Sequence, residues 1–279
     1  MRGRAAVMVV ALAGALGTWT GVARAAAGPV RVTFKLAPEV GYAVHADGFG
    51  EPRGLLVSPA GDLYVADAKR SEVWRIGRDG RREVVARNVA GASDVAIDAL
   101  GALYVSATPR NQVIKVSPQG VATVYLDAVS GPADLAFDLH GDLVVCEPSA
   151  NAVRAFSSPR QARVVARAEA PRGLAFARDG VALVAESGPG RILRVHPDGR
   201  TERFAEGLQG PEGIAIGPSG DLYVAEPGAG RVSRIRPDGS RQIVAEGLSA
   251  PRDPAFDAFG QLFVAESGAG RVLRLTGDF

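Results

Sequence analysis

The chain has 279 residues, enough for one large or two small domains. Lys and Arg number 32 against 30 Asp and Glu, a near balance that does not predict binding to nucleic acid or to anionic membranes. A single cysteine, Cys146, excludes an internal disulfide, so the fold depends on packing alone.

The N-terminal residues 1–25 have the parts of a secretory signal peptide. A basic start, MRGR, precedes a long apolar run, and Ala23-Arg24-Ala25 has the small-x-small pattern of a cleavage site. A membrane anchor is the alternative, but Gly and Thr interrupt the run. We therefore expect cleavage after Ala25 and export to the periplasm or the medium. The abundance of Arg, Ala and Gly is typical of a bacterial GC-rich genome.

From residue 52 onward the sequence repeats about every 40 residues. Six copies begin at Pro52, Ala92, Pro132, Pro171, Pro211 and Pro251. Each copy has four short apolar runs separated by turns rich in Gly, Pro and Asn, such as GIAI, LYVA, VSRI and RQIVAEGL in the fifth. Four β-rich runs per repeat without helical periodicity are typical of a propeller. The predicted fold class is an all-β, six-bladed β-propeller of four-stranded blades.

The two ends of the chain predict how the ring closes. The sixth copy stops at Phe279 after its third run, and residues 46–52 (ADGFGEP) match residues 245–251 (AEGLSAP). We therefore predict a single domain over residues 26–279, in which a strand at about 32–46 pairs with the last blade and leaves no long free edge. Pro254 suits an innermost strand, whose free edge faces the axis.

The pattern P-x-G-I-A-x-x-x-x-G-D-L-Y-V-A-E-x-G-x-x-R-V resembles the NHL-repeat consensus over about residues 32–279. It is also similar to the gluconolactonase-like six-bladed propeller superfamily and to the virginiamycin B lyases. The resemblance is specific for the fold and much less so for function. It implies two enzyme types, lactonases with Glu, Asn and Asp metal ligands near the strand-one openings, and lyases with histidines beside a metal-binding Glu.

An acidic residue ends the second run in five of the six copies. These residues are Asp67, Glu147, Glu186, Glu226 and Glu266, and the second copy has Ala107 instead. A metal site, a catalytic carboxylate and a scaffold contact are all conceivable. Five near-equivalent copies favour a structural acidic ring that accepts turn N–H groups or pairs with arginines of a neighbouring blade.

Residues at the openings of the first runs are expected to meet at the same mouth of the ring. Hard cations need several oxygen ligands, and Asp94, Asp134, Asp253 and Glu212 could form a rearranged site for Ca²⁺ or another divalent cation. The alternative is that the aspartates cap backbone N–H groups.

An arginine-rich arc is expected at the same mouth. Arg53, Arg172, Glu212 and Arg252 come from consecutive blades, and arginine forks bind carboxylate or phosphate. They could therefore hold a small anionic ligand. The alternative is that these arginines pair with the acidic ring, which would be a weak surface contact.

Histidine and cysteine chemistry receives little support. His45, His140 and His196 fall on the closing strand and on two turns of the opposite face, with no pair or cluster. Cys146 occupies a position that holds Ala or Ser in the other copies, so we expect a small buried residue and no nucleophile.

The sequence therefore predicts an exported propeller that recognises a small molecule, peptide or protein partner at its mouth. The alternative is a gluconolactonase-like hydrolase or a virginiamycin B lyase-like enzyme with a rearranged divalent-metal site, so catalysis is left open. A purely structural assembly module is a third reading. We expect a monomer that binds neither nucleic acid nor, after cleavage, a membrane.

Overall fold

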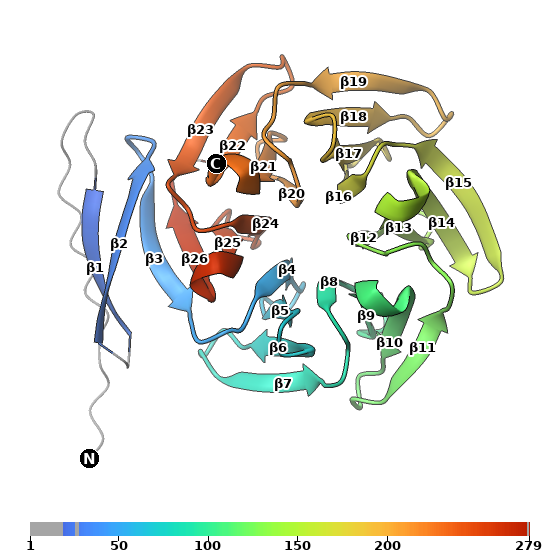
Figure 1. The fold of residues 1–279 in the computed structure, drawn as a ribbon, viewed down its shortest axis with the longest axis horizontal. Helices are drawn as coiled ribbons and strands as arrows, with labels where there is room; N and C mark the ends of the chain where they lie inside the picture. The colour runs from blue at the N-terminus through green and yellow to red at the C-terminus, as the bar shows by residue number, and fades with distance from the viewer. Residues whose placement is uncertain (1–18, 26–27, 278) are drawn as a thin grey trace.

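Six antiparallel sheets surround a central axis in the computed structural model, which describes residues 19–25, 28–277 and 279 (Figure 1). From the axis outward, the strands of the first three blades are β4 (Pro52–Val57), β5 (Leu63–Asp67), β6 (Glu72–Ile76) and β7 (Arg82–Ala86); β8 (Ala92–Ile97), β9 (Leu103–Ala107), β10 (Gln112–Val116) and β11 (Ala122–Leu126); and β12 (Leu135–Phe137), β13 (Leu143–Glu147), β14 (Ala152–Ser158) and β15 (Gln161–Arg167).

The other three blades follow the same plan. Their strands are β16 (Pro171–Phe176), β17 (Ala182–Glu186), β18 (Arg191–Val195) and β19 (Thr201–Ala205); β20 (Ile214–Ile216), β21 (Leu222–Glu226), β22 (Arg231–Ile235) and β23 (Arg241–Glu246); and β24 (Pro251–Phe256), β25 (Leu262–Glu266) and β26 (Arg271–Thr276). Four single turns of 3-10 helix join second to third strands: η1 (Thr108–Arg110), η2 (Pro148–Ala150), η3 (Pro227–Ala229) and η4 (Ser267–Ala269). The predicted six-bladed all-β propeller is confirmed.

The N-terminal part of the chain closes the ring, as predicted. Strand β3 (Gly41–Ala46) pairs with β26 and becomes the outermost strand of the sixth blade, with Val44 opposite Leu273. The predicted bounds of this strand, about 32–46, are too long. Strand β2 (Gly28–Leu36) runs instead to the outer edge of blade five, where Lys35 pairs with Glu246. A turn closed by the Val40 N–H and the Ala37 carbonyl, 3.0 Å apart, separates the two strands.

Most of the expected signal peptide lies outside the described residues. Of residues 1–25 only Trp19–Ala25 is described; it forms β1 and pairs with β2 (Figure 1). Cleavage after Ala25 therefore stays a prediction. Among the helices of the described ranges, none combines the length and the hydropathy needed to span a bilayer.

The turn from the second to the third strand has a left-handed residue in every blade. Gly and Asn tolerate positive φ better than most residues, and the sequence places them here in five of the six blades. The positive-φ residues are Ser71, Asn111, Asn151, Gly190, Gly230 and Gly270, with φ from 50° to 68°. Each of these turns returns the chain into the third strand without lengthening the loop.

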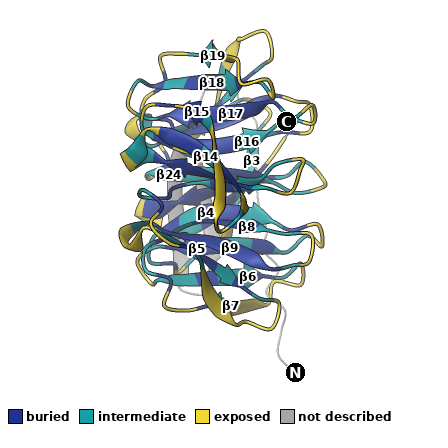
Figure 2. Cartoon of the chain, turned by 90° about the vertical axis from the view of Figure 1, so that its right-hand side faces the viewer, coloured by how far each residue is buried: buried dark blue, intermediate teal, exposed yellow. Residues whose placement is uncertain are grey.

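Apolar side chains fill the spaces between blades. Six buried clusters each lie between two neighbouring blades. One of these clusters joins blade six to blade one through residues such as Val272 and Val65. In side view the buried residues form the middle of the ring, and the exposed residues lie on the turns and on outermost strands such as β7 (Figure 2). The ring therefore has a continuous core, and its two faces are formed by turns.

Glycines allow the inner strands to approach one another at the axis. A Cβ atom on Gly173 would lie 2.1 Å from the Glu212 carbonyl oxygen of the next blade, which is far inside van der Waals contact. Gly54 and Gly213 have similarly short approaches to the strand of the following blade.

We expect the substitution Gly173→Ala to lower the free energy of unfolding by about 1–3 kcal/mol, because the added methyl group overpacks a backbone contact. Urea unfolding measures this difference. Gly188→Ala is the matched control, since its Cβ would meet nothing closer than 3.7 Å. Equal stabilities for the two variants would contradict the close approach.

Candidate functional site

The six inner strands open at one end of the axis into a small central pocket. Its volume is about 40 Å³, room for only a few water molecules. The structure places all seven mouth residues that the sequence singled out around this pocket, and its lining is Arg53, Gly54, Ser93, Asp94, Ala133, Asp134, Arg172, Glu212, Gly213, Arg252 and Asp253. None of the five residues of the acidic ring lines it.

The three aspartates of the pocket each bridge to the next blade. One carboxyl oxygen of each accepts a backbone N–H from the neighbouring inner strand. The pairs are Asp94 with Leu135 at 3.0 Å, Asp134 with Leu174 at 2.9 Å and Asp253 with Leu55 at 2.7 Å. These contacts are the backbone caps that the sequence allowed as the alternative to metal binding.

The second oxygens of Asp94 and Asp253 are also engaged in the blade contact. They point at glycines of the preceding blade, 2.3 Å from the position of a Cβ on Gly54 and 2.2 Å from that of a Cβ on Gly213. A carboxyl group on one blade therefore occupies the space that a glycine leaves on the blade before it.

This arrangement does not fit a divalent-metal site. No group of three or more His, Cys, Asp or Glu side chains in the described part of the chain is disposed to hold a metal ion. Glu212 is paired with Arg252, whose Nη1 lies 2.5 Å from its Oε2. The four acidic candidates thus lie round one pocket, but among the described residues no three of them are disposed to hold a metal ion, and we derive no chemistry through a metal.

Burial changes the protonation of these aspartates. It raises the pKa of Asp94 to about 6, although hydrogen bonds from the Leu135 N–H and from Asp134 partly offset the effect. Burial, followed by the charge of Asp94, raises the pKa of both Asp134 and Asp253 well above its usual range. A hydrogen bond between the two side chains further raises the pKa of Asp134 and lowers that of Asp94. The carboxyl groups at the axis therefore carry less negative charge than their number suggests.

We expect Asp94→Asn to stabilise the protein more at pH 7 than at pH 4. The folded state holds the Asp94 proton more tightly than the unfolded chain does, so Asp94 lowers stability as pH rises from about 4 to about 6. Asparagine can still accept the Leu135 N–H and removes this loss, which is up to about 3 kcal/mol for a two-unit pKa shift. Urea unfolding of both proteins from pH 4 to pH 8 measures the difference, and parallel pH profiles would contradict it.

The three arginines of the mouth differ in their partners. Arg53 pairs with Glu51, its Nη2 lying 2.6 Å from Oε1, and Arg252 pairs with Glu212. The side chain of Arg172 is exposed and makes no hydrogen bond or ion pair with any residue of the described ranges. None of the three pairs with the acidic ring, which was the alternative to an anion site, because the ring carboxylates already have other partners.

The carboxylates of the acidic ring are buried and bind the loop that enters their own blade. Each accepts a backbone N–H from a residue 17 positions earlier. The donor and acceptor residues are Gly50 and Asp67, Ser130 and Glu147, Glu169 and Glu186, Gln209 and Glu226, and Ser249 and Glu266. A buried charge needs such partners, because its transfer from water is otherwise very costly.

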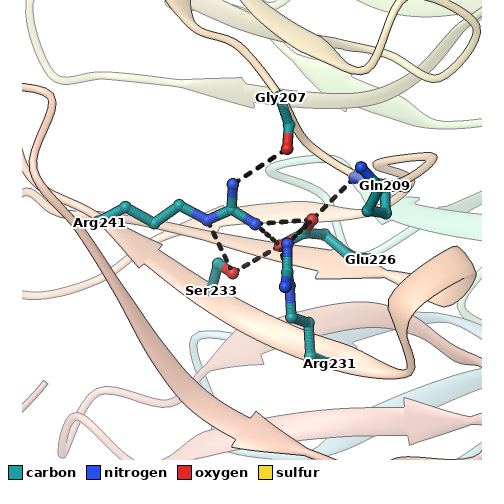
Figure 3. A network of polar contacts seen from close by, with 6 residues as sticks. All are labelled: Gly207, Gln209, Glu226, Arg231, Ser233 and Arg241. Atoms are coloured by element: carbon teal, nitrogen blue, oxygen red, sulfur yellow. Dashed lines mark hydrogen bonds and ion pairs between the residues drawn. The ribbon is translucent and has the colours of Figure 1, made fainter.

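Glu226 has the fullest set of these contacts (Figure 3). Arg231 donates two hydrogen bonds at 2.9 and 2.8 Å, Arg241 donates two at 2.6 and 2.8 Å, and Ser233 donates one at 2.5 Å. Burial alone would raise the pKa of Glu226, but the hydrogen bonds from Arg231, Ser233 and Gln209 outweigh it and lower the pKa. The residue is a fixed anion of the scaffold.

We expect Glu226→Gln to lower the free energy of unfolding by about 3–5 kcal/mol, because it leaves two arginines facing a buried neutral group. Glu206→Gln is the control. Glu206 is 57% exposed and pairs only with Arg203 at 3.1 Å, so its loss is expected to cost less than about 1 kcal/mol. Denaturant unfolding compares the two, and similar losses would contradict the scaffold role.

The arginines that pair with the acidic ring stabilise the scaffold, and the sequence did not lead us to predict which arginines these would be. Arg191, Arg231 and Arg271 each lie five residues after a ring glutamate and directly opposite it across the hairpin. In blade three Arg154 takes this role and donates to both oxygens of Glu147. The regular Glu-to-Arg spacing was the available signal.

The histidines and the cysteine lie away from the pocket. His45 packs edge-on against Phe263, with ring centroids 4.9 Å apart, and burial, with the charges of Arg274 and Arg82, lowers its pKa to about 4. His140 and His196 lie on turns of the opposite face. Cys146 is fully buried, and burial raises the pKa of its thiol well above the usual value. The central pocket therefore has no histidine or thiolate among its described residues.

Comparison with known proteins supports the fold. A family model described as strictosidine synthase-like, N-terminal, matches residues 200–235, and no curated protein matches the chain. A gluconolactonase from Xanthomonas campestris has 18% identity and a TM-score of 0.77, covering 97% of this chain and 100% of its own.

Two lyases are also similar in structure. A streptogramin B lyase has 17% identity and a TM-score of 0.70, covering 86% of this chain and 98% of its own. Virginiamycin B lyase from Staphylococcus aureus has 16% identity and a TM-score of 0.68, covering 87% and 99%. Sequence identities this low show that the fold is shared and do not show whether the activity is shared. The chain has the six-bladed β-propeller fold and shares its overall architecture with these solved structures.

Proposed function

We propose that this protein is an exported binding propeller that recognises a small anionic ligand at its central mouth. The observation that carries the proposal is Arg172, an exposed guanidinium at the pocket with no partner among the described residues. A charged group that is held at the mouth of a ring and left unpaired is suited to a ligand with the opposite charge.

The neighbours of Arg172 support an anion rather than a cation. Arg53 and Arg252 are each neutralised by one glutamate, and the Nε atom of Arg252 is buried without a hydrogen-bond partner among the described residues. Raised pKa values reduce the negative charge of Asp134 and Asp253, and a protonated carboxyl group can donate a hydrogen bond to an oxyanion. A carboxylate or phosphate group fits these donors.

We expect Arg172→Ala to weaken binding of a small oxyanion about 10- to 100-fold, the effect of losing a charge-assisted hydrogen bond. Isothermal titration with a panel of small carboxylates and with inorganic phosphate measures this and separates the two ligand types. Arg160→Ala is the matched control, because Arg160 is exposed on an outer turn and does not line the pocket. Equal affinities for the two variants, or no binding by the parent protein, would overturn the proposal.

The rival function is a hydrolase or lyase of the kind carried by the similar structures. It would need a divalent cation at a rearranged set of ligands, and the observed aspartates are engaged between blades. Thermal unfolding with EDTA and then with Ca²⁺, Mg²⁺, Mn²⁺ or Zn²⁺ distinguishes the two. A saturable rise in the midpoint that Asp134→Ala or Asp253→Ala abolishes would favour the enzyme and lead to assays with lactones.

A further inference from the structure

The openings of the six inner strands differ in the residue that precedes them. In blades two, three and five this residue is a left-handed glycine, and in blades one, four and six it is not glycine. The mouth residue two positions later follows the same division, because it is an arginine only where the glycine is missing. The preceding and mouth residues are Glu51 and Arg53, Gly91 and Ser93, Gly131 and Ala133, Ala170 and Arg172, Gly210 and Glu212, and Ala250 and Arg252.

Ala170 and Ala250 keep the left-handed backbone although they carry a β-carbon. Their φ angles are 46° and 47°, against 60° for Gly210 at the same place in blade five. A β-carbon makes this conformation unfavourable, and a proline follows each alanine, which restricts it further because a residue before proline favours extended backbone. Ala128 is also left-handed, with φ 61°, but no proline follows it. Backbone strain of this kind is concentrated at functional sites.

The surrounding loop holds Ala170 in its strained conformation. Its N–H donates to the Asn151 side chain at 2.9 Å, and its carbonyl accepts the Ser187 N–H at 3.2 Å. Space alone does not explain where alanine is used. A Cβ atom on Gly210 would meet nothing closer than 3.9 Å, so blade five has room for an alanine and yet has a glycine.

Arg172 depends more on its backbone than the other two arginines of the mouth do. Arg53 is held by Glu51, whose Oε1 lies 2.8 Å from its Nε and 2.6 Å from its Nη2, and Arg252 is held by Glu212 at 2.5 Å. The Arg172 side chain has no such partner among the described residues. A restrained backbone removes part of the conformational entropy that an unpaired arginine would otherwise lose when it binds a ligand.

We propose that Ala170 is a positioning residue for Arg172. Its β-carbon narrows the backbone conformations of the blade-four opening, so the guanidinium is held at the pocket before a ligand arrives. Ala250 restrains the backbone at Arg252 in the same way. This inference rests on the proposed function, since it concerns how the same mouth holds an anion. It implies that strain at the opening lowers stability and raises affinity.

The test compares the full chain with its Ala170→Gly variant by thermal unfolding and by isothermal titration, with acetate and inorganic phosphate as the probes. Glycine relieves the strain, so we expect the unfolding midpoint to rise by about 2–4 °C. Glycine also loosens the opening, so we expect the affinity for the tighter-binding probe to fall about 3- to 10-fold. A variant that is more stable and binds less tightly does not owe its weaker binding to misfolding. A midpoint that falls would contradict the strain.

Ala128→Gly is the matched control, because it makes the same change at a left-handed alanine that does not line the pocket. We expect its midpoint to rise as well and its affinity for both probes to stay the same. Unchanged affinity in Ala170→Gly, or an equal loss of affinity in Ala128→Gly, would overturn the positioning role. Binding by the parent protein would in either case still support the proposed function.

A second measurement decides the inference if neither probe binds the parent protein, a result that would overturn the proposed function. The backbone order parameter of Arg172, from NMR relaxation, is expected to be lower in Ala170→Gly than in the parent. Arg160, exposed on an outer turn, is expected to keep its value and is the internal control. Equal values for Arg172 in the two proteins would overturn the positioning role.

Discussion

A buried carboxylate at the end of the second strand fixes five of the six blades to the loop that enters the blade. In five blades this group accepts a backbone N–H from a residue 17 positions earlier, and arginines surround it in most of them. Because the loops that enter the blades lead directly into the inner strands, these contacts set the positions of the residues at the mouth. The acids that look most like a site in the sequence are the supports of the site.

Blade two lacks this tether to its own entering loop and is tethered to the next blade. It has Ala107 at the acidic position, and hydroxyl groups beside it bind the loop that enters blade three. Ser106 donates to the Ala133 carbonyl at 2.7 Å, and Thr108 donates to the Pro132 carbonyl at 2.6 Å. A neutral tether avoids the desolvation of a charge, and it leaves this blade without the arginines that a carboxylate would need.

Much of the fold could be predicted from the sequence, because the same pattern of apolar runs and turns occurs six times along the chain. The phase of the repeat predicts the blades, the turns and the closure of the ring. The path of β2 was not predictable, since its contact with blade five rests on two paired residues outside the repeat, Lys35 and Leu36. Local pattern carries little information about such a short pairing.

For the site, the sequence predicted which residues gather at the mouth but not how they pair. Glu186 and Arg191 face each other across one hairpin, whereas the sequence allowed an arginine such as Arg172 from the mouth as the partner. The residue types alone do not show whether a ring glutamate pairs with an arginine on its own hairpin or with an arginine elsewhere in the fold.

The pairing of β3 with β26 has a consequence for how the chain folds. Val44 and Leu273 are partners across roughly 230 residues, and closing a loop of that length costs about 5 kcal/mol of chain entropy. The sixth blade lacks its outer strand until this contact forms, so ring closure must wait for nearly the whole chain to be present. A chain that emerges N-terminus first therefore carries an unpaired strand at its beginning while all six repeats follow, and folding is dominated by its most distant contact.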